Sequence, residues 1–335
     1  MQEKALVDSF GRVVKDLRIS ITDRCNFRCL YCMPAEGMQW VRREDVLTFE
    51  EIVRIARIGV ERYGFDGIRL TGGEPTVRAQ LPLLVEKLSS LRNPLTSKPV
   101  DIAMTTNGAT LSTLAEDLKK AGLNRINISL DTLDRKKFAQ VTRRDQLLKV
   151  IGGIQAAKAV GFDPVKLNVV VMRGINDDEI LDFIEFGVDL GVTPRFIEFM
   201  PLDADDAWSE NKVVPSDEIV DIIASKYSLT KINNGSDPAS RYRLGDTNHE
   251  FGVIPTVTEP FCESCDRVRI TAEGQFRTCL FAIEEYDLRE IMRRGGSDDE
   301  LAAEMERAVG LKWAGHQIGN VNFLRPNRSM SQIGG

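Results

Sequence analysis

The chain has 335 residues, of which 42% are hydrophobic and 28% charged, and its net charge at pH 7 is −6. This composition is typical of a soluble globular protein with a large core, and it excludes a disordered chain and the broad basic face that general nucleic-acid binding needs. No apolar run approaches the ~20 residues that cross a bilayer, and residues 1–4 begin no secretory segment. We therefore expect a cytoplasmic protein that binds neither membranes nor nucleic acid.

Short apolar runs alternate with longer amphipathic ones over the first 230 residues. The apolar runs predict strands at 17–21, 67–70, 101–105, 125–130, 166–172 and 195–199. The segments between them predict helices at 48–64, 81–91, 111–121, 135–140, 146–160 and 177–190. Strand–helix units in succession favour a parallel, right-handed array. Six units are too few for a closed eight-fold barrel, so we predict an α/β fold built on a partial, open (β/α)6 TIM-like barrel. A doubly wound sheet is the alternative that periodicity leaves open.

The pattern changes after residue 213. A helix is predicted at 217–227, followed by short β-like pieces, helices at 284–294 and 298–310, and a polar tail at 325–335 that ends in glycines. We therefore divide the chain into a barrel at 1–230 and a C-terminal region at 231–335.

The six cysteines fall into two triplets, and grouped cysteines in a reducing compartment indicate metal binding or catalysis. Cys25, Cys29 and Cys32 follow the first strand with the spacing C-x3-C-x2-C. Three such thiolates can ligate three irons of a [4Fe–4S] cluster and leave the fourth iron open. A structural zinc site is the alternative, but it needs four ligands and no fourth lies at a suitable spacing.

The second triplet combines a C-x2-C pair, Cys262 and Cys265, with Cys279 after a gap of thirteen residues. A second [4Fe–4S] cluster with an open iron is the simplest interpretation; a zinc ion with His249 or Asp266 as fourth ligand is the alternative. Arg267 and Arg269 follow directly and alternate on one side of a predicted strand. Arginine matches phosphate bidentately, so these residues, together with Arg18, Arg69, Thr105 and Lys166 on the barrel strands, suggest a polyphosphate pocket.

The first triplet, with Tyr31 before its last cysteine, resembles the radical S-adenosylmethionine superfamily. The sequence Gly72-Gly73-Glu74-Pro75 after the second strand extends that resemblance, as do Ser129 and Asp131 after the fourth strand and Arg195 and Met200 around the sixth. The resemblance implies that S-adenosylmethionine chelates the open iron and is cleaved to a 5′-deoxyadenosyl radical. It also implies that Glu74 and backbone groups hold the methionine ammonium.

Seen as a whole, the chain resembles one family, the GTP 3′,8-cyclases, which are lyases of molybdenum cofactor biosynthesis. The segments that carry this resemblance are 16–34, 68–75, 105–108, 128–131, 196–201, 261–269 and 334–335. The resemblance implies conversion of GTP to 3′,8-cyclo-7,8-dihydro-GTP, with two [4Fe–4S] clusters and the open iron of the second cluster against guanine.

The family resemblance also implies roles for individual residues. S-adenosylmethionine is bound by Tyr31, Gly73, Ser129, Arg195 and Met200. GTP is bound by Arg18, Arg69, Thr105, Lys166, Arg267, Val268 and Arg269. Catalysis is supported by Arg267, Arg269 and the terminal Gly334 and Gly335.

The implied partners are a flavodoxin-like or ferredoxin-like electron donor, a cyclic pyranopterin monophosphate synthase that takes the product, and a second copy of the chain in a homodimer. Two other functions stay open on the sequence alone. A radical enzyme that modifies peptides also carries C-terminal cysteines, although usually more than three. An iron–sulfur electron carrier is disfavoured because carriers have four protein ligands per cluster.

Overall fold

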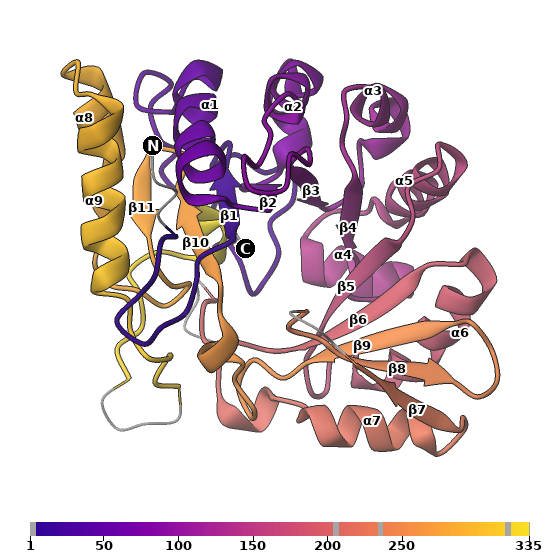
Figure 1. Cartoon of the computed structure of the whole chain (residues 1–335). Helices are drawn as coiled ribbons and strands as arrows, with labels where there is room; N and C mark the ends of the chain where they lie inside the picture. Colours follow the sequence, from indigo (N-terminus) through magenta and orange to yellow (C-terminus); the bar gives the residue numbers. More distant parts are fainter. Residues whose placement is uncertain (1–4, 204–207, 234–236, 319–322, 335) are drawn as a thin grey trace.

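The structure is a computed structural model that describes residues 5–203, 208–233, 237–318 and 323–334 (Figure 1). Its strands are β1 Asp16–Ser20, β2 Gly67–Thr71, β3 Asp101–Thr106, β4 Arg125–Ser129, β5 Val165–Val171, β6 Thr193–Glu198, β7 Leu229–Ile232, β8 Ser240–Leu244, β9 Glu250–Ile254, β10 Arg267–Ile270, β11 Gln275–Arg277 and β12 Tyr286–Asp287. Its α-helices are α1 Phe49–Arg57, α2 Leu81–Ser89, α3 Ala115–Lys120, α4 Arg135–Thr142, α5 Leu147–Ala159, α6 Ile180–Leu190, α7 Ser216–Ala224, α8 Leu288–Arg293, α9 Asp298–Gly310 and α10 Met330–Ile333.

The strands form one twelve-stranded sheet in the order β12-β11-β10-β1-β2-β3-β4-β5-β6-β9-β8-β7. Strands β1 to β6 are parallel neighbours in chain order, so the prediction of six successive strand–helix units is confirmed. The order never reverses within these strands, and the doubly wound alternative is therefore wrong. The two ends of the sheet, β12 and β7, do not pair in the described part of the chain, and the barrel is open as predicted.

The C-terminal region extends this sheet at both ends. Strand β10 pairs in parallel with β1, and β9 pairs in parallel with β6. A boundary at residue 230 would fall inside β7, and the strands that follow continue the barrel sheet on either side.

Local sequence explains where the helices begin. Thr48 caps α1 and forms a capping box with Glu51, and Ser297 forms the same box with Glu300 at α9. The helix predicted at 48–64 continues beyond α1 as a π-helical turn, Ile58–Arg62. The short helix α10 was not predicted, since residues 325–335 read as a polar tail.

Helices α1, α2, α3, α5 and α6 surround the parallel strands on the outside, as Figure 1 shows. Side chains such as Ile19, Leu70, Ile126 and Phe196 are buried between strands and helices in one continuous core. No helix among the described residues is long and apolar enough to span a bilayer. Because the helices cover the outer face of the parallel strands, the other face lines the interior of the barrel, where the polar side chains gather.

Candidate active site

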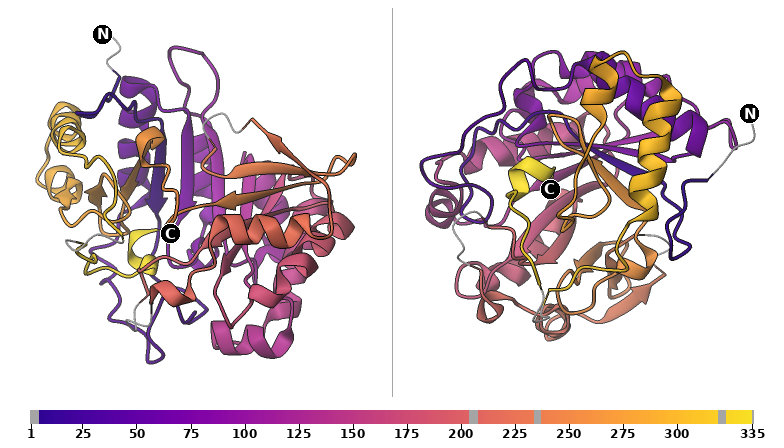
Figure 2. Two further views of the ribbon diagram at one scale, coloured as in Figure 1. Left: turned by 90° about the horizontal axis from the view of Figure 1, so that it is seen from below. Right: turned by 90° about the vertical axis from the view of Figure 1, so that its left-hand side faces the viewer.

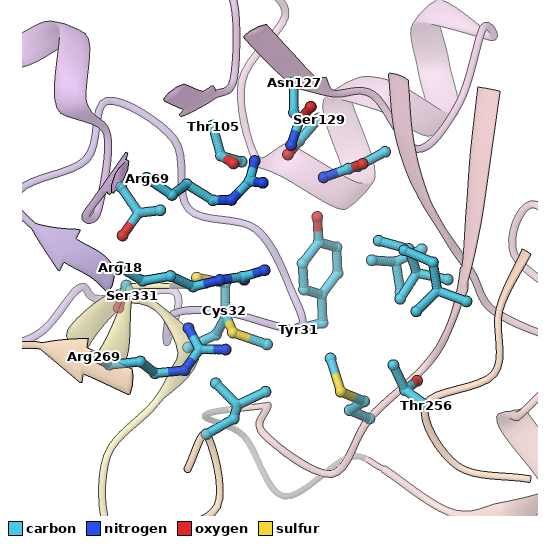
Figure 3. Close-up of a pocket in the computed structure, with 18 of the residues that line it drawn as sticks. Arg18, Tyr31, Cys32, Arg69, Thr105, Asn127, Ser129, Thr256, Arg269 and Ser331 are labelled. Atoms are coloured by element: carbon cyan, nitrogen blue, oxygen red, sulfur yellow. The ribbon is translucent and has the colours of Figure 1, made fainter. Parts of the chain in front are cut away.

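One cavity runs through the interior of the barrel and is lined by all six cysteines. Arginines, hydroxyl and amide side chains from β1 to β6 and from β10 line it as well (Figure 3). The structure thus brings together two triplets that are more than 220 residues apart in the sequence.

The first triplet lies on the loop beyond the carboxyl end of β1, and the glycine-rich turn after β2 supports it. Gly73 donates its N–H to the carbonyl of Thr22 at 2.8 Å. A Cβ on Gly73 would lie 2.4 Å from the carbonyl oxygens of Asp23 and Arg24. Glycine is therefore required at position 73 because the cysteine loop approaches it closely, and this holds whether or not a ligand also binds there.

Glu74 is buried, and its carboxylate accepts four hydrogen bonds. Its Oε1 accepts from the N–H and hydroxyl of Thr76 and the hydroxyl of Thr106, and its Oε2 accepts from the N–H of Asn107 at 2.6 Å. Burial raises the pKa of Glu74, while these hydrogen bonds partly oppose the shift. Glu74 organises the turn between β2 and β3, and its Oε2 retains the capacity to accept from a ligand ammonium.

The second triplet lies at the opposite end of the barrel axis from the first. Cys262 and Cys265 immediately precede β10, at its amino end. Strand β11 runs antiparallel to β10 with Arg277 opposite Arg269, so the hairpin returns Cys279 to the neighbourhood of Cys265. The five residues of β1 lie between the two triplets, and at ~3.3 Å per residue they correspond to about 16 Å.

The thiols are free and partly buried. Burial raises the pKa of Cys25 to about 11 and that of Cys32 to about 12. In the described part of the chain, no three His, Cys, Asp or Glu side chains are close enough to hold a single metal ion. Each cysteine of a cubane bonds a different iron, so the thiolates of such a cluster stand apart from one another.

Three arginines from adjacent strands form a row inside the cavity. Arg18 is in register with Arg69 on β2 and with Arg269 on β10, and Figure 3 shows the three side chains pointing the same way. Burial and the neighbouring guanidiniums lower the pKa of Arg18 well below its ordinary value. The Nε atoms of Arg18 and Arg69 are buried and have no hydrogen-bond partner in the part of the chain that the structure describes. Three guanidiniums grouped in this way form a site with the charge and the donors that suit a polyanion.

A buried pair links the first triplet to the fourth strand. Tyr31 donates its hydroxyl to Asp131 at 2.5 Å, and the N–H of Val170 donates to the other oxygen of Asp131 at 2.9 Å. Burial raises the pKa of Asp131 to about 6, against the effect of these hydrogen bonds. The remaining side chains expected around S-adenosylmethionine, Gly73, Ser129, Arg195 and Met200, also line the cavity.

Two of the residues predicted to bind GTP lie outside the cavity lining. Val268 is fully buried in the core and does not line the cavity, because strand alternation turns it away from Arg267 and Arg269. Its side chain is thus not placed to touch a ligand. Lys166 also lies outside the lining, and its Nζ pairs with Asp237 at 3.1 Å. Thr105 does line the cavity, beside Arg69.

The C-terminal tail folds back onto the barrel, as Figure 2 shows. The carbonyl of Gly334 accepts a hydrogen bond from Arg269 at 2.7 Å, and a Cβ there would lie 2.4 Å from the hydroxyl of Thr71. Arg328, at the start of this segment, pairs with Glu285 and Glu273. The tail therefore reaches the row of arginines; Gly335 lies outside the described residues.

Several lining residues were missed from the sequence. They are Asn107, Asn127, Asn168, Thr256, Phe261, His316 and Ser331. The amides of β4 and β5 lie in register with predicted residues, Asn127 opposite Thr105 and Asn168 opposite Ser129, and polar residues within apolar strands are the signal that could have identified them. The histidine at the second triplet is His316; His249, which the zinc alternative used, lies on the turn between β8 and β9 and outside the cavity.

Comparison with known proteins shows what the chain as a whole is similar to. Residues 19–187 match the model of the radical SAM superfamily, and residues 192–318 match the model named Molybdenum Cofactor Synthesis C. A GTP 3′,8-cyclase of Streptomyces coelicolor is 45% identical over 333 residues, covering 98% of this chain and 96% of that protein. The GTP 3′,8-cyclase of Paenarthrobacter nicotinovorans is 45% identical over 348 residues, covering 98% and 97%.

Among solved structures, Streptococcus suis SuiB bound to S-adenosylmethionine has a similar fold. The TM-score is 0.58 at 16% identity, covering 84% of this chain and 66% of that one. At this identity the likeness concerns the fold alone.

Proposed function

Because the chain belongs to the GTP 3′,8-cyclase family of radical S-adenosylmethionine enzymes, we propose that it converts GTP to 3′,8-cyclo-7,8-dihydro-GTP in molybdenum cofactor biosynthesis. The observation that carries this proposal is the cavity that joins both cysteine triplets to a row of partly buried arginines. A radical source at one end and a polyanion site in the middle suit a nucleoside triphosphate.

The chain uses S-adenosylmethionine and a [4Fe–4S] cluster, as its superfamily does. We assign this cluster to Cys25, Cys29 and Cys32, whose partly buried thiols face the cavity and leave one iron open for a ligand. When bound, these groups supply the radical that removes hydrogen from the ribose 3′ carbon. The polypeptide orients the bound molecules and excludes water.

The residues around the first triplet would position S-adenosylmethionine. Glu74 offers its Oε2 to the methionine ammonium, while the backbone at Gly73 and the side chains of Ser129, Arg195 and Met200 border the same space. The Tyr31–Asp131 hydrogen bond fixes the loop that carries the last two cysteines.

Arg18, Arg69 and Arg269 would bind the triphosphate, with Arg267 and Thr105 beside them. Lys166 would join them only by exchanging Asp237 for phosphate, and Val268 only through its backbone. The carbonyl of Gly334 engages Arg269, so the terminal glycines would act by aligning that guanidinium.

We assign a second [4Fe–4S] cluster to Cys262, Cys265 and Cys279, with its open iron toward the guanine base. This assignment is supported by the antiparallel strand pair that returns Cys279 to the C-x2-C pair. It is also supported by the sequence, in which this second group contains three cysteines and no fourth. An electron donor of the flavodoxin or ferredoxin type, a homodimeric state, a cyclic pyranopterin monophosphate synthase that takes the product, and a cytoplasmic location complete the proposal.

Anaerobic incubation of the reconstituted chain with S-adenosylmethionine, dithionite and GTP tests the function. We expect GTP consumption together with 5′-deoxyadenosine, and 5′-deoxyadenosine without loss of GTP would refute the substrate assignment.

Reconstitution should give about eight irons per chain. Cys25→Ala should abolish S-adenosylmethionine cleavage, whereas Cys279→Ala should retain cleavage, hold about four irons and lose GTP turnover.

The alternative substrate is a peptide, as in radical enzymes that modify side chains. The row of arginines in the cavity favours a polyphosphate over a peptide backbone, which carries no comparable charge. Competition of GTP binding by inorganic triphosphate, but not by a neutral peptide, is the expected result.

A further inference from the structure

Two buried cations lie behind the second cysteine triplet, on residues to which no role has been given above. Lys312 follows α9 and is 3% exposed. Arg12 comes from the N-terminal segment and pairs with Asp8. They approach the C-x2-C turn from opposite ends of the chain.

Each cation holds the backbone of one cysteine. Arg12 donates to the carbonyl of Cys262 at 2.7 Å and also to the carbonyls of Trp313 and Ala314. Lys312 donates to the carbonyl of Cys265 at 2.9 Å and to that of Arg267 at 3.0 Å. The turn is thus anchored before any cofactor is present.

Lys312 also contacts a sulfur atom. Its Nζ lies 3.8 Å from the Sγ of Cys265, and no carboxylate in the described part of the chain forms an ion pair with it. A buried ammonium needs a compensating anion, and the nearest candidate is the Cys265 thiolate.

We propose that Lys312 is a positioning residue of the second iron–sulfur site, which holds the C-x2-C turn by its carbonyls and keeps a positive charge against the Cys265 sulfur. This inference rests on the second cluster proposed above. A positive charge beside a ligating thiolate stabilises the reduced, more negative cluster, and hydrogen bonds to the sulfurs act in the same direction. Lys312 therefore raises the reduction potential of the second cluster above the value that the same cluster has without this charge.

The test compares Lys312→Met, which removes the charge at similar size, with Lys312→Arg, which keeps it. Lys98→Met, on an exposed lysine, is the control for net charge. Each full-length chain is reconstituted anaerobically, its iron is counted, and both clusters are titrated against potential by electron paramagnetic resonance. In Lys312→Met we expect the midpoint potential of the second cluster to fall by about 59 mV or more, a tenfold change in the ratio of reduced to oxidised cluster. The first cluster is unchanged and monitors folding.

An unchanged second potential in Lys312→Met would overturn the inference. If Lys312→Met retains only the first cluster while Lys312→Arg retains both, the positive charge is needed to hold the site and the inference stands. Loss of the second cluster from both variants would overturn the role assigned to charge. A wild-type chain that binds only about four irons would instead refute the second cluster itself.

Discussion

At the scale of single residues, the site is defined by a row of three arginines that line the cavity. Arg18 lies between Arg69 and Arg269 in the sheet register, and Asp16 is the acid beside it, with its Oδ1 3.6 Å from the Nε of Arg18. One carboxylate cannot neutralise the row. We therefore expect the arginines to repel one another and to lower the stability of the protein when no polyanion is bound.

Replacement of the central arginine should separate these two effects. In Arg18→Met we expect GTP to bind at least ~30-fold more weakly, since removal of a buried charged partner costs about 2 kcal/mol or more. The melting temperature of the apo protein should stay the same or rise, because repulsion is relieved. Calorimetry measures both quantities, and Arg92→Gln on the exposed surface is the control. An apo protein that melts much earlier would contradict the argument.

A second residue-scale prediction concerns Asp131, whose pKa is raised from 3.8 to about 6 by burial. The folded protein then binds a proton more tightly than the unfolded chain, so the stabilisation is present below pH 3.8 and is lost as pH rises through about 6. The free energy of unfolding of Asp131→Asn, relative to wild type, should therefore increase by up to ~3 kcal/mol between pH 4 and 7 and then level off. Urea denaturation of the apo proteins measures this difference. Asp246→Asn, at an exposed position, should run parallel to wild type; parallel curves for Asp131→Asn would refute the prediction.

At the scale of elements, loops that carry the second triplet are fixed by buried groups at strand ends. Glu198, the last residue of β6, is completely buried. It accepts hydrogen bonds from the backbone of Ser216, Val257 and Thr258 and from the hydroxyl of Thr258. The barrel thereby holds the segment that leads from β9 to Cys262.

Glu198→Gln should loosen that segment, because an amide offers one acceptor oxygen where the carboxylate offers two. We expect a loss of about 2–3 kcal/mol in the free energy of unfolding. Reconstituted protein should lose iron from the second triplet and keep it at the first. Denaturant titration and iron analysis check both results, with Glu259→Gln on the exposed part of the same loop as control. Equal loss of iron from both triplets would show that the effect is not local.

At the scale of the whole molecule, one sheet joins both ends of the chain. Strand β1 pairs with β2 on one side and with β10 on the other, and the outer edge of β6 pairs with β9. A fragment that ended at residue 230 would leave β1 and β6 as the unpaired edges of a parallel sheet. It would also lack the core side chains of β9 and β10, such as Phe251 and Val268.

We therefore expect a chain of residues 1–230 to show no cooperative thermal transition, while the full chain unfolds in one. Near-ultraviolet circular dichroism during heating measures this. An independently folding fragment, with a transition comparable to that of the full chain, would instead establish residue 230 as a domain boundary.

The sequence is enough to predict the parallel strands, because runs such as 166–172 are apolar, β-branched and bounded by helices. It indicates a strand at Arg267 and Arg269 but does not reveal how β10–β12 pair. These strands are two to four residues long, and β10 pairs with β1, β11 with β10 and β12 with β11. Helix α10 was missed for a similar reason, since contacts such as that between Gly334 and Arg269 join residues 65 positions apart. The cysteines and arginines were identified by type and spacing. The distance between the two triplets could not be predicted in this way, because it depends on how the strands that precede and follow them are paired.

The length and register of β1 fix the distance between the two cysteine triplets. Its five residues set the span between the end where the radical originates and the end where the second triplet lies. Side chains alternate along a strand, so a one-residue insertion would turn Arg18 out of the cavity and lengthen the span by ~3.3 Å at once. A molecule that engages both ends must span the length of β1 and pass the row of arginines. We therefore expect this barrel to select its substrate by length as well as by charge.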